Sequence, residues 1–113
     1  MANSASLVIL VRLDRSSRWR LLVFPLKVAG DGILVNAVCP GPIDGPRMDA
    51  IIEAKARTTG GSPEEIRTQL QNETLLGRLI PAEHIGEMVA FLASERAASI
   101  TGQTLDVNAG YRV

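Results

Sequence analysis

Few side chains in this sequence could do chemistry, and those few stand alone. The chain has one histidine, His84, one cysteine, Cys39, and one tyrosine, Tyr111. An isolated imidazole lacks the nucleophile or metal that would give it a catalytic role, and the neighbours of Cys39 supply no positive charge to activate a thiol. One histidine and one cysteine also fall short of a metal-ligand set. We therefore expect no catalytic residue and no metal site, with His84 solvated and Cys39 buried.

A turn, Pro40-Gly41-Pro42, is the remaining candidate for a binding role. It closes the run Ile33–Val38, whose β-branched and nearly continuous apolar residues predict a strand buried on both faces of a parallel sheet. Ligands of open parallel sheets bind just beyond the carboxyl ends of the strands. Proline sets a fixed turn, and glycine lets the main chain approach a flat ring without a side-chain clash. The same three residues could also do no more than end a strand.

Three helical segments lie between this strand and a second one, Thr104–Val107. We expect helices over about residues 47–57, from Ser62 onward, and over about 81–94. The second begins with a capping serine, a proline in the first turn and a glutamate three residues after the cap. The third places apolar residues at helical spacing, so that one stripe can pack on a sheet. A strand, helices and a strand form a crossover unit between parallel strands, which predicts an α/β fold.

The first thirty residues differ in composition from the rest. Their basic residues outnumber a single acid, Asp14, and all the glycines lie at or beyond Gly30. The apolar pieces Leu7–Val11 and Leu21–Phe24 could be the strands of a hairpin, or parts of a weak helix that ends at Pro25. The basic stretch Arg15–Arg20 is interpreted as a solvated face rather than a nucleic-acid site.

Length and charge exclude several classes of protein. The chain has 113 residues, 46% hydrophobic content and a formal net charge of zero, which is enough for one small domain and gives no overall attraction to nucleic acid or membrane. The apolar run near the start is far shorter than the roughly 20 residues of a membrane helix. A single cysteine rules out an internal disulfide and suits a reducing compartment. We expect a cytoplasmic protein with neither nucleic acid nor membrane as a partner.

Several blocks, taken together over about residues 28 to 110, resemble the C-terminal half of the short-chain dehydrogenase/reductase family. They match the family's late strand and Pro-Gly turn, its last helix and its last strand in order and spacing. The blocks are Val35–Asp44, Gly77-Arg78, Pro81–Gly86, Phe91–Ser94, Ile100–Gln103 and Leu105–Val107. The resemblance implies a partial Rossmann-like parallel sheet in which the first half of the fold is missing.

The resemblance also implies a cofactor, NAD or NADP. In the family the Pro-Gly turn lies against the nicotinamide, and the main chain at the position of Ile43 hydrogen-bonds its carboxamide. The cofactor-binding positions carried over are Pro40, Gly41, Pro42, Ile43 and Gly45. The family commonly has threonine where this chain has Gly45, so a hydroxyl contact to the cofactor is absent here.

The segment from Pro46 to about Leu76 corresponds to the family's substrate loop and its helices. Its apolar residues Met48, Ile51 and Ile52 could line a substrate pocket, or they could be the packing face of a helix. The residues alone leave both interpretations open.

The family's catalytic and cofactor motifs are absent from the sequence. The family uses a tyrosine, a lysine four residues later and an upstream serine, whereas Tyr111 lies two residues before the last residue, Val113. Gly30-Asp31-Gly32 is only a fragment of the dinucleotide fingerprint, and it leads into a strand rather than out of one. We therefore expect an oxidoreductase-family chain that is truncated and inactive alone. Residues 28–113 would be the C-terminal half of the family domain, and residues 1–27 a divergent segment of another origin, joined by a reading-frame change or a wrongly chosen start.

Two alternative functions remain. The chain could be a non-catalytic interaction module that forms a homo-oligomer, or joins a full-length family subunit, through its last helix and last strand. The apolar residues available for such an interface are Ile85, Met88, Val89, Leu92, Leu105 and Val107. The other alternative is a non-functional gene fragment.

Overall fold

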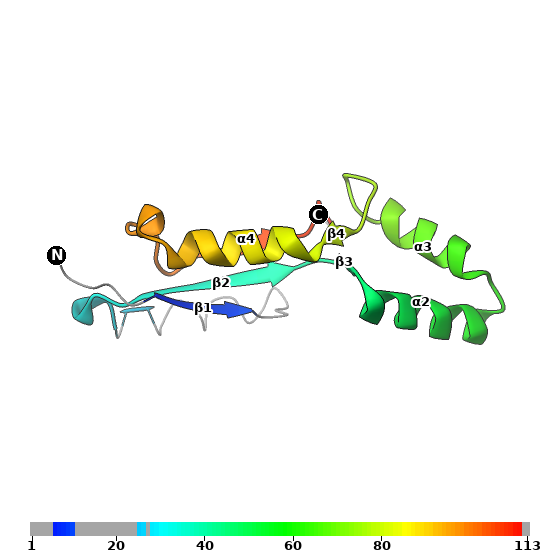
Figure 1. The fold of residues 1–113 in the computed structure, drawn as a ribbon, viewed down its shortest axis with the longest axis horizontal. Helices are drawn as coiled ribbons and strands as arrows, with labels where there is room; N and C mark the ends of the chain where they lie inside the picture. The colour runs from blue at the N-terminus through cyan, green and yellow to red at the C-terminus, as the bar shows by residue number, and fades with distance from the viewer. Residues whose placement is uncertain (1–5, 11–24, 27, 112–113) are drawn as a thin grey trace. The chain divides into compact units, whose positions relative to one another are not determined.

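The computed structural model describes residues 6–10, 25–26 and 28–111. The chain divides into two compact units (Figure 1). The first comprises Met1–Pro40 and Ile85–Asp106, and the second comprises Gly41–His84 and Val107–Val113.

The first unit is built on a three-stranded sheet with the order β1-β2-β5. Strand β1 (Ser6–Leu10) pairs in parallel with β2 (Leu34–Pro40), in the register Ser6↔Leu34 to Leu10↔Val38. The centre of β2 is buried throughout, and Val38 has no exposed surface. The predicted strand over residues 33–38 is confirmed with a shift of its ends. A strand buried on both faces explains its nearly continuous apolar sequence.

Strand β5 (Thr104–Val107) lies on the other side of β2. The Gly102 N–H donates to the Val35 carbonyl and the Ala37 N–H donates to the Gln103 carbonyl, both at 2.8 Å. These bonds advance in the same direction along both segments, as in a parallel pair. The parallel strand–helices–strand unit predicted from the sequence is therefore confirmed, and with it the α/β fold class.

Asn36 is a buried polar residue in the middle of β2, only 2% exposed. Its Nδ2 donates to the Ile100 carbonyl at 3.0 Å, and its Oδ1 accepts from the Gln103 N–H at 3.1 Å. Burial of an amide is tolerated because both ends of the side chain are hydrogen-bonded. Asn36 thus fastens the segment that enters β5 to the central strand.

Helix α4 (Ala82–Ala93) runs along β2 (Figure 1) and leads into the 3₁₀ turn η2 (Glu95–Ala97). Its buried residues Ile85 and Leu92 lie two helical turns apart, and Leu92 is completely buried. Met88 and Val89, between them, are half-buried. The predicted apolar stripe is therefore a core face of this helix. Ile85 and Leu92 are buried within the chain, so they are not available for the interface with another subunit that the sequence suggested.

The second unit contains a helical hairpin, α2 (Pro46–Thr59) and α3 (Pro63–Asn72). Its small core consists of Ile52, Ala56 and Ile66, with Met48 and Leu70 packed against it. The predicted cap at Ser62 is confirmed, because Ser62 Oγ accepts from the Glu65 N–H and the Ser62 N–H donates to Glu65 Oε2, both at 3.2 Å.

Two very short strands complete the second unit. Strand β3 (Ile43–Asp44) pairs in parallel with β4 (Ile80–Pro81), and no periodic pattern in the sequence predicts either of them. The 3₁₀ turn η1 (Ala29–Asp31) precedes β2 in the first unit.

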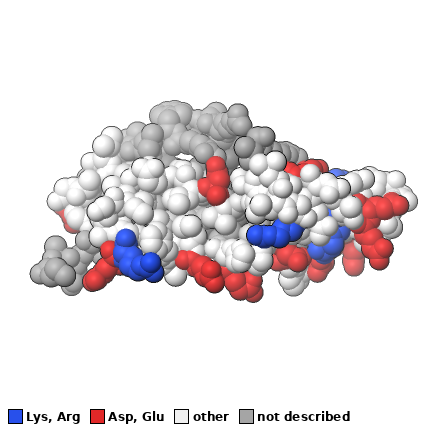
Figure 2. Space-filling view, turned by 90° about the horizontal axis from the view of Figure 1, so that it is seen from above, with Lys and Arg blue, Asp and Glu red and all other residues white. Residues whose placement is uncertain are grey.

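The alternatives for Leu7–Val11 are decided in favour of a strand, although its observed partner is β2 in parallel rather than a hairpin neighbour. The proposed hairpin partner Leu21–Phe24 lies outside the described residues. No helix in the described ranges is long and apolar enough to cross a membrane. On the face shown in Figure 2, acidic and basic side chains are interspersed.

Candidate functional site

The candidate site is the turn over residues 41–45, which begins where β2 ends at Pro40. Its path is fixed by two main-chain hydrogen bonds. The Gly41 N–H donates to the Val107 carbonyl at 3.0 Å, and the Ile80 N–H donates to the Pro42 carbonyl at 2.9 Å. Proline has no main-chain N–H, but no hydrogen bond is lost at position 42, because only the carbonyl of Pro42 takes part in this pairing. The turn is thus held by the residue that ends β5 and by β4.

The main-chain N–H and C=O of Ile43 do not take part in the pairing of β3 with β4. In the β3–β4 ladder Ile43 is opposite Ile80, and the Ile80 N–H bonds to Pro42. In a parallel ladder a residue bonds to the two residues that flank its partner, so the N–H and C=O of Ile43 point away from β4. Among the residues that the structure describes, none is hydrogen-bonded to either group. Ile43 is half-buried. A main-chain donor and acceptor without partners in the described part of the chain are the kind of groups to which an amide ligand bonds.

Gly41 is required by contact with the protein itself. A β-carbon on this residue would lie 2.7 Å from both Cα and Cβ of Asn108, and 2.9 Å from Cδ1 of Ile80. The sequence-based explanation was that glycine makes room for a flat ring. On the side where a β-carbon would lie, glycine instead makes room for the protein's own residues. Asn108 and Ile80 fill the volume that a side chain would need. Asn108 was not among the residues predicted from the sequence, although its place just beyond the carboxyl end of a strand was a signal for it.

Gly45 caps the start of α2 in a conformation that favours glycine. Its φ is 155° and its ψ is −178°, and no heavy atom lies within 4 Å of the position of a β-carbon. The Gly45 carbonyl accepts from the Asp49 N–H at 3.0 Å, but there is no side-chain cap. The chain therefore lacks the hydroxyl that the family commonly has at this position. The main-chain conformation of Gly45 is also one that residues with a side chain rarely adopt.

Arg67 forms ion pairs with two aspartates at the end of the turn. Arg67 Nη1 donates to Asp44 Oδ1 at 3.0 Å, and Nη2 donates to Asp49 Oδ1. The hydrogen bond with Asp44 is the largest influence that raises the pKa of Arg67 above its usual value, and both carboxylates add to it while desolvation opposes it. An arginine is charged in proteins in any case, so the guanidinium neutralises the carboxylates that it contacts beside the turn. Sequence reasoning missed Arg67, because nothing in the linear pattern pairs it with Asp44.

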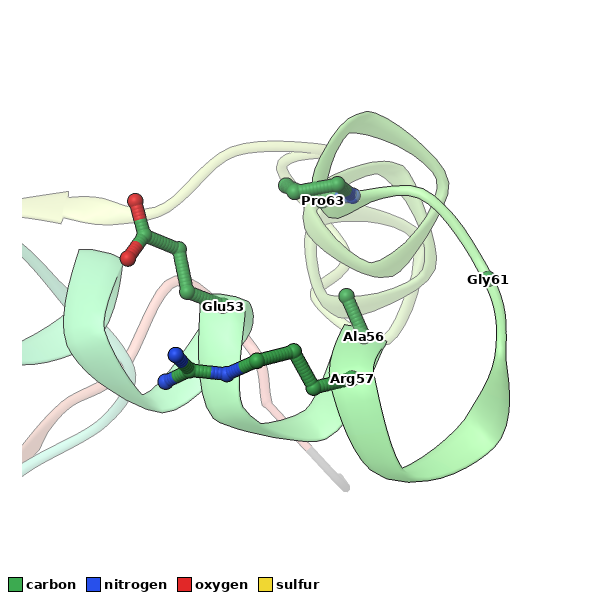
Figure 3. Close-up of a pocket in the computed structure, with 5 residues that line it drawn as sticks. All are labelled: Glu53, Ala56, Arg57, Gly61 and Pro63. Atoms are coloured by element: carbon green, nitrogen blue, oxygen red, sulfur yellow. The ribbon is translucent and has the colours of Figure 1, made fainter.

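The helical hairpin resolves the two interpretations of its apolar residues. Met48 and Ile52 pack in the core shared by α2 and α3, so the packing interpretation holds for both. Ile51 lies outside this core and is 48% exposed. A separate hollow of about 310 Å³ opens where α2 turns into α3. Figure 3 shows that Glu53 and Arg57 extend from α2 beside it, and the five lining residues drawn there include no serine, cysteine or histidine.

The exposure of His84 and the burial of Cys39 agree with the sequence prediction. His84 is exposed, and Cys39 is 8% exposed within β2. Within residues 6–10, 25–26 and 28–111, no group of three or more histidine, cysteine or acidic side chains could hold a metal ion. Asp44 and Asp49, the two carboxylates nearest to Gly45 in the sequence, are both paired with Arg67.

Comparison with known proteins decides the family. The model of a family described as enoyl-(acyl carrier protein) reductase matches residues 24–112. The chain belongs to the short-chain dehydrogenase/reductase family.

Relatives within this family support the assignment. A monensin polyketide synthase putative ketoacyl reductase of Streptomyces virginiae is 38% identical over 84 residues, which are 74% of this chain and 32% of the relative. A diacetyl reductase of Staphylococcus aureus is 36% identical over 85 residues, which are 75% of this chain and 33% of the relative. The chain therefore spans about a third of the length of these short-chain dehydrogenases/reductases.

Solved structures show the same partial match. A short-chain dehydrogenase family protein from Francisella tularensis superposes with a TM-score of 0.79 at 30% identity, over 85% of this chain and 40% of that one. An actinorhodin polyketide ketoreductase variant solved with NADPH superposes with a TM-score of 0.80 at 25% identity, over 95% of this chain and 47% of that one. The Rossmann-like α/β arrangement is thus shared with members of the short-chain dehydrogenase/reductase family.

Proposed function

We propose that this chain is the C-terminal part of an NAD(P)-dependent oxidoreductase, and that its turn over residues 41–45 forms the nicotinamide side of the cofactor site. One observation carries the proposal: the N–H and C=O of Ile43 point away from β4 and have no hydrogen-bond partner among the described residues. A carboxamide offers one acceptor and two donors, which complements this pair of groups. The actinorhodin polyketide ketoreductase was solved with NADPH, which supports the cofactor class.

The residues of the turn would have different roles in binding the nicotinamide. Ile43 N–H would donate to the carboxamide oxygen, and its carbonyl would accept from the amide nitrogen. Gly41 and Pro42 hold Ile43 in place through their bonds to Val107 and Ile80. Gly45 leaves open space where the family has a threonine hydroxyl. When bound, the nicotinamide supplies or accepts a hydride, and the chain's own residues orient the ring.

The reaction class follows from the relatives' names. A ketoacyl reductase and a diacetyl reductase both act on carbonyl compounds, and we assign the same substrate class to the oxidoreductase of which this chain is a part. The 113 residues contain no tyrosine followed four places later by lysine. We therefore expect no hydride transfer by these residues alone, because a proton donor tuned for neutral pH is missing.

The division of the chain also belongs to this proposal. We infer that residues 28–113 carry the family sequence and that residues 1–27 are a divergent segment. The family match covers residues 24–112, so its start close to this boundary supports the inference, while residues 24–27 lie inside the match. Sequencing the gene and its transcript tests it, since an upstream Tyr-x-x-x-Lys in another frame is expected, and its absence would count against the inference. Cytoplasmic location and self-association stay predictions.

Saturation-transfer NMR with NADPH and the full chain tests the binding proposal. Protons of the nicotinamide ring should receive more saturation than those of the adenine, because the family's adenine-side half is absent from these residues. The change Ile43→Pro, which removes the N–H of that residue, should reduce the transfer, and Ile43→Val should preserve it. Stronger saturation of the adenine, or equal transfer in the proline variant, would overturn the proposal. A parallel assay with NADPH and diacetyl should show no turnover.

A further inference from the structure

The Arg67 side chain joins three elements of the second unit. It extends from α3 and donates to Asp44 on β3 and to Asp49 in the first turn of α2. Asp44 and Asp49 lie on either side of Gly45, which connects the turn to the helical hairpin. One guanidinium therefore spans the point where the candidate site becomes α2.

The core of the hairpin does not include β3. Ile52, Ala56 and Ile66 pack α2 on α3, and none of them comes from the turn over residues 41–45. Within the described part of the chain, the bond between Arg67 and Asp44 is the only side-chain hydrogen bond that links α3 to β3. Arg67 thus adds a direct charged link between α3 and β3 to the indirect connection that runs through α2 and the apolar core of the hairpin.

The chemistry of the contact suits arginine. A planar guanidinium can direct separate N–H groups at two carboxylates, while a lysine ammonium is a single compact charge. Without Arg67 the negative charges of Asp44 and Asp49 would repel each other across Gly45. The side chains are 33% exposed for Arg67, 56% for Asp44 and 54% for Asp49, so the surrounding water and salt reach this network.

We propose that Arg67 is a positioning residue, which holds Asp44 and Asp49 together and so fixes the α2–α3 hairpin against the turn that carries Ile43. This inference rests on the proposed nicotinamide site for its functional consequence. Its structural part, the attachment of α3 to β3, can be measured without cofactor.

The functional test compares NADPH binding by the full chain and its variants, followed at the amide resonance of Ile43. Arg67→Met should weaken the affinity by about threefold, the effect of an exposed ion-pair network. Asp44→Asn should act similarly, and combining the two changes should add little. Arg67→Lys should recover part of the loss. Arg57→Met, which removes the same charge elsewhere in the hairpin, should bind like the wild type.

The structural test measures amide hydrogen exchange of α3 in the same proteins without NADPH. Exchange should be about threefold faster in Arg67→Met than in Arg57→Met at low salt, and the difference should shrink at high salt. Equal exchange in the two variants would overturn the attachment. If wild-type Ile43 does not respond to NADPH, the proposed function fails and this comparison alone decides the attachment. If it responds and Arg67→Met binds like the wild type, the positioning role fails and the proposed function stands.

Discussion

Asn108 approaches Gly41 so closely that a β-carbon on the glycine would lie 2.7 Å from the Asn108 Cα. The Gly41 N–H bonds to the carbonyl of Val107, the neighbour of Asn108. Asn108 is itself fixed, because its Oδ1 accepts from the Gly110 N–H at 2.9 Å. The turn that carries the candidate site therefore rests on the turn after β5.

Replacing Gly41→Ala should destabilise the protein. The new methyl group meets main-chain atoms of Asn108 that cannot move without disturbing the turn after β5, and overpacking of this kind costs about 1–3 kcal/mol. Urea unfolding measures the loss. Gly86→Ala is the control, because a β-carbon at Gly86 in α4 meets no heavy atom within 4 Å. That change should stabilise the helix by up to about 1 kcal/mol. A loss of the same size in both variants would contradict the packing argument.

Replacing Asn36→Leu should remove both side-chain hydrogen bonds that fasten β2 to the segment before β5. The Ile100 carbonyl and the Gln103 N–H would each lose a partner, and we expect the free energy of unfolding to fall by about 2–4 kcal/mol. Gln103→Ala is the matched control, since it keeps the main-chain N–H bonded to Asn36 and should change stability by less than about 0.5 kcal/mol. Equal stability of Asn36→Leu and wild type in urea would refute this role.

Replacing Gly45→Thr should lower stability, although threonine is the residue common in the family. A threonine hydroxyl could cap α2, which contributes about 1 kcal/mol, but a side chain at a φ of 155° costs about 1–3 kcal/mol. We expect a net loss in thermal unfolding. The neighbouring helix connection offers a control, Gly61→Ala, where φ is not in the left-handed region and the nearest atom is the flexible end of Glu65 at 3.4 Å. A more stable threonine variant would show that the turn adopts another conformation.

The elements that the sequence predicted are those with enough length to show a pattern. The β-branched run in β2, the stripe on α4 and the cap at Ser62 each depend on local spacing, and each was confirmed. Strands β3 and β4 have two residues each, and so short a strand has no periodicity. The parallel pairing of β1 with β2 joins segments far apart in the sequence, so local pattern could predict the strand but not its partner.

The candidate site, too, could be predicted from the sequence only in part. Its location followed from a strand end and from the resemblance to a family. The residues that hold the turn in place could not be predicted, because Asn108 and Ile80 come close to Gly41 only in the folded chain. The pairing of Arg67 with Asp44 and Asp49 likewise appears only when α3 folds back toward β3. The sequence therefore predicted where the candidate site begins, whereas the residues that support the turn appear only in the folded chain.

The most direct test of the proposed site is the amide resonance of Ile43 during a titration of the full chain with NADPH. The account predicts that this N–H shifts toward the position of a hydrogen-bonded amide, with a saturable dependence on NADPH concentration. The amide of Ile80, already bonded to Pro42, should change less. Ile43→Val should reproduce the binding curve. An Ile43 amide that does not move while other amides respond would place NADPH elsewhere, and an absence of any response would contradict the cofactor site.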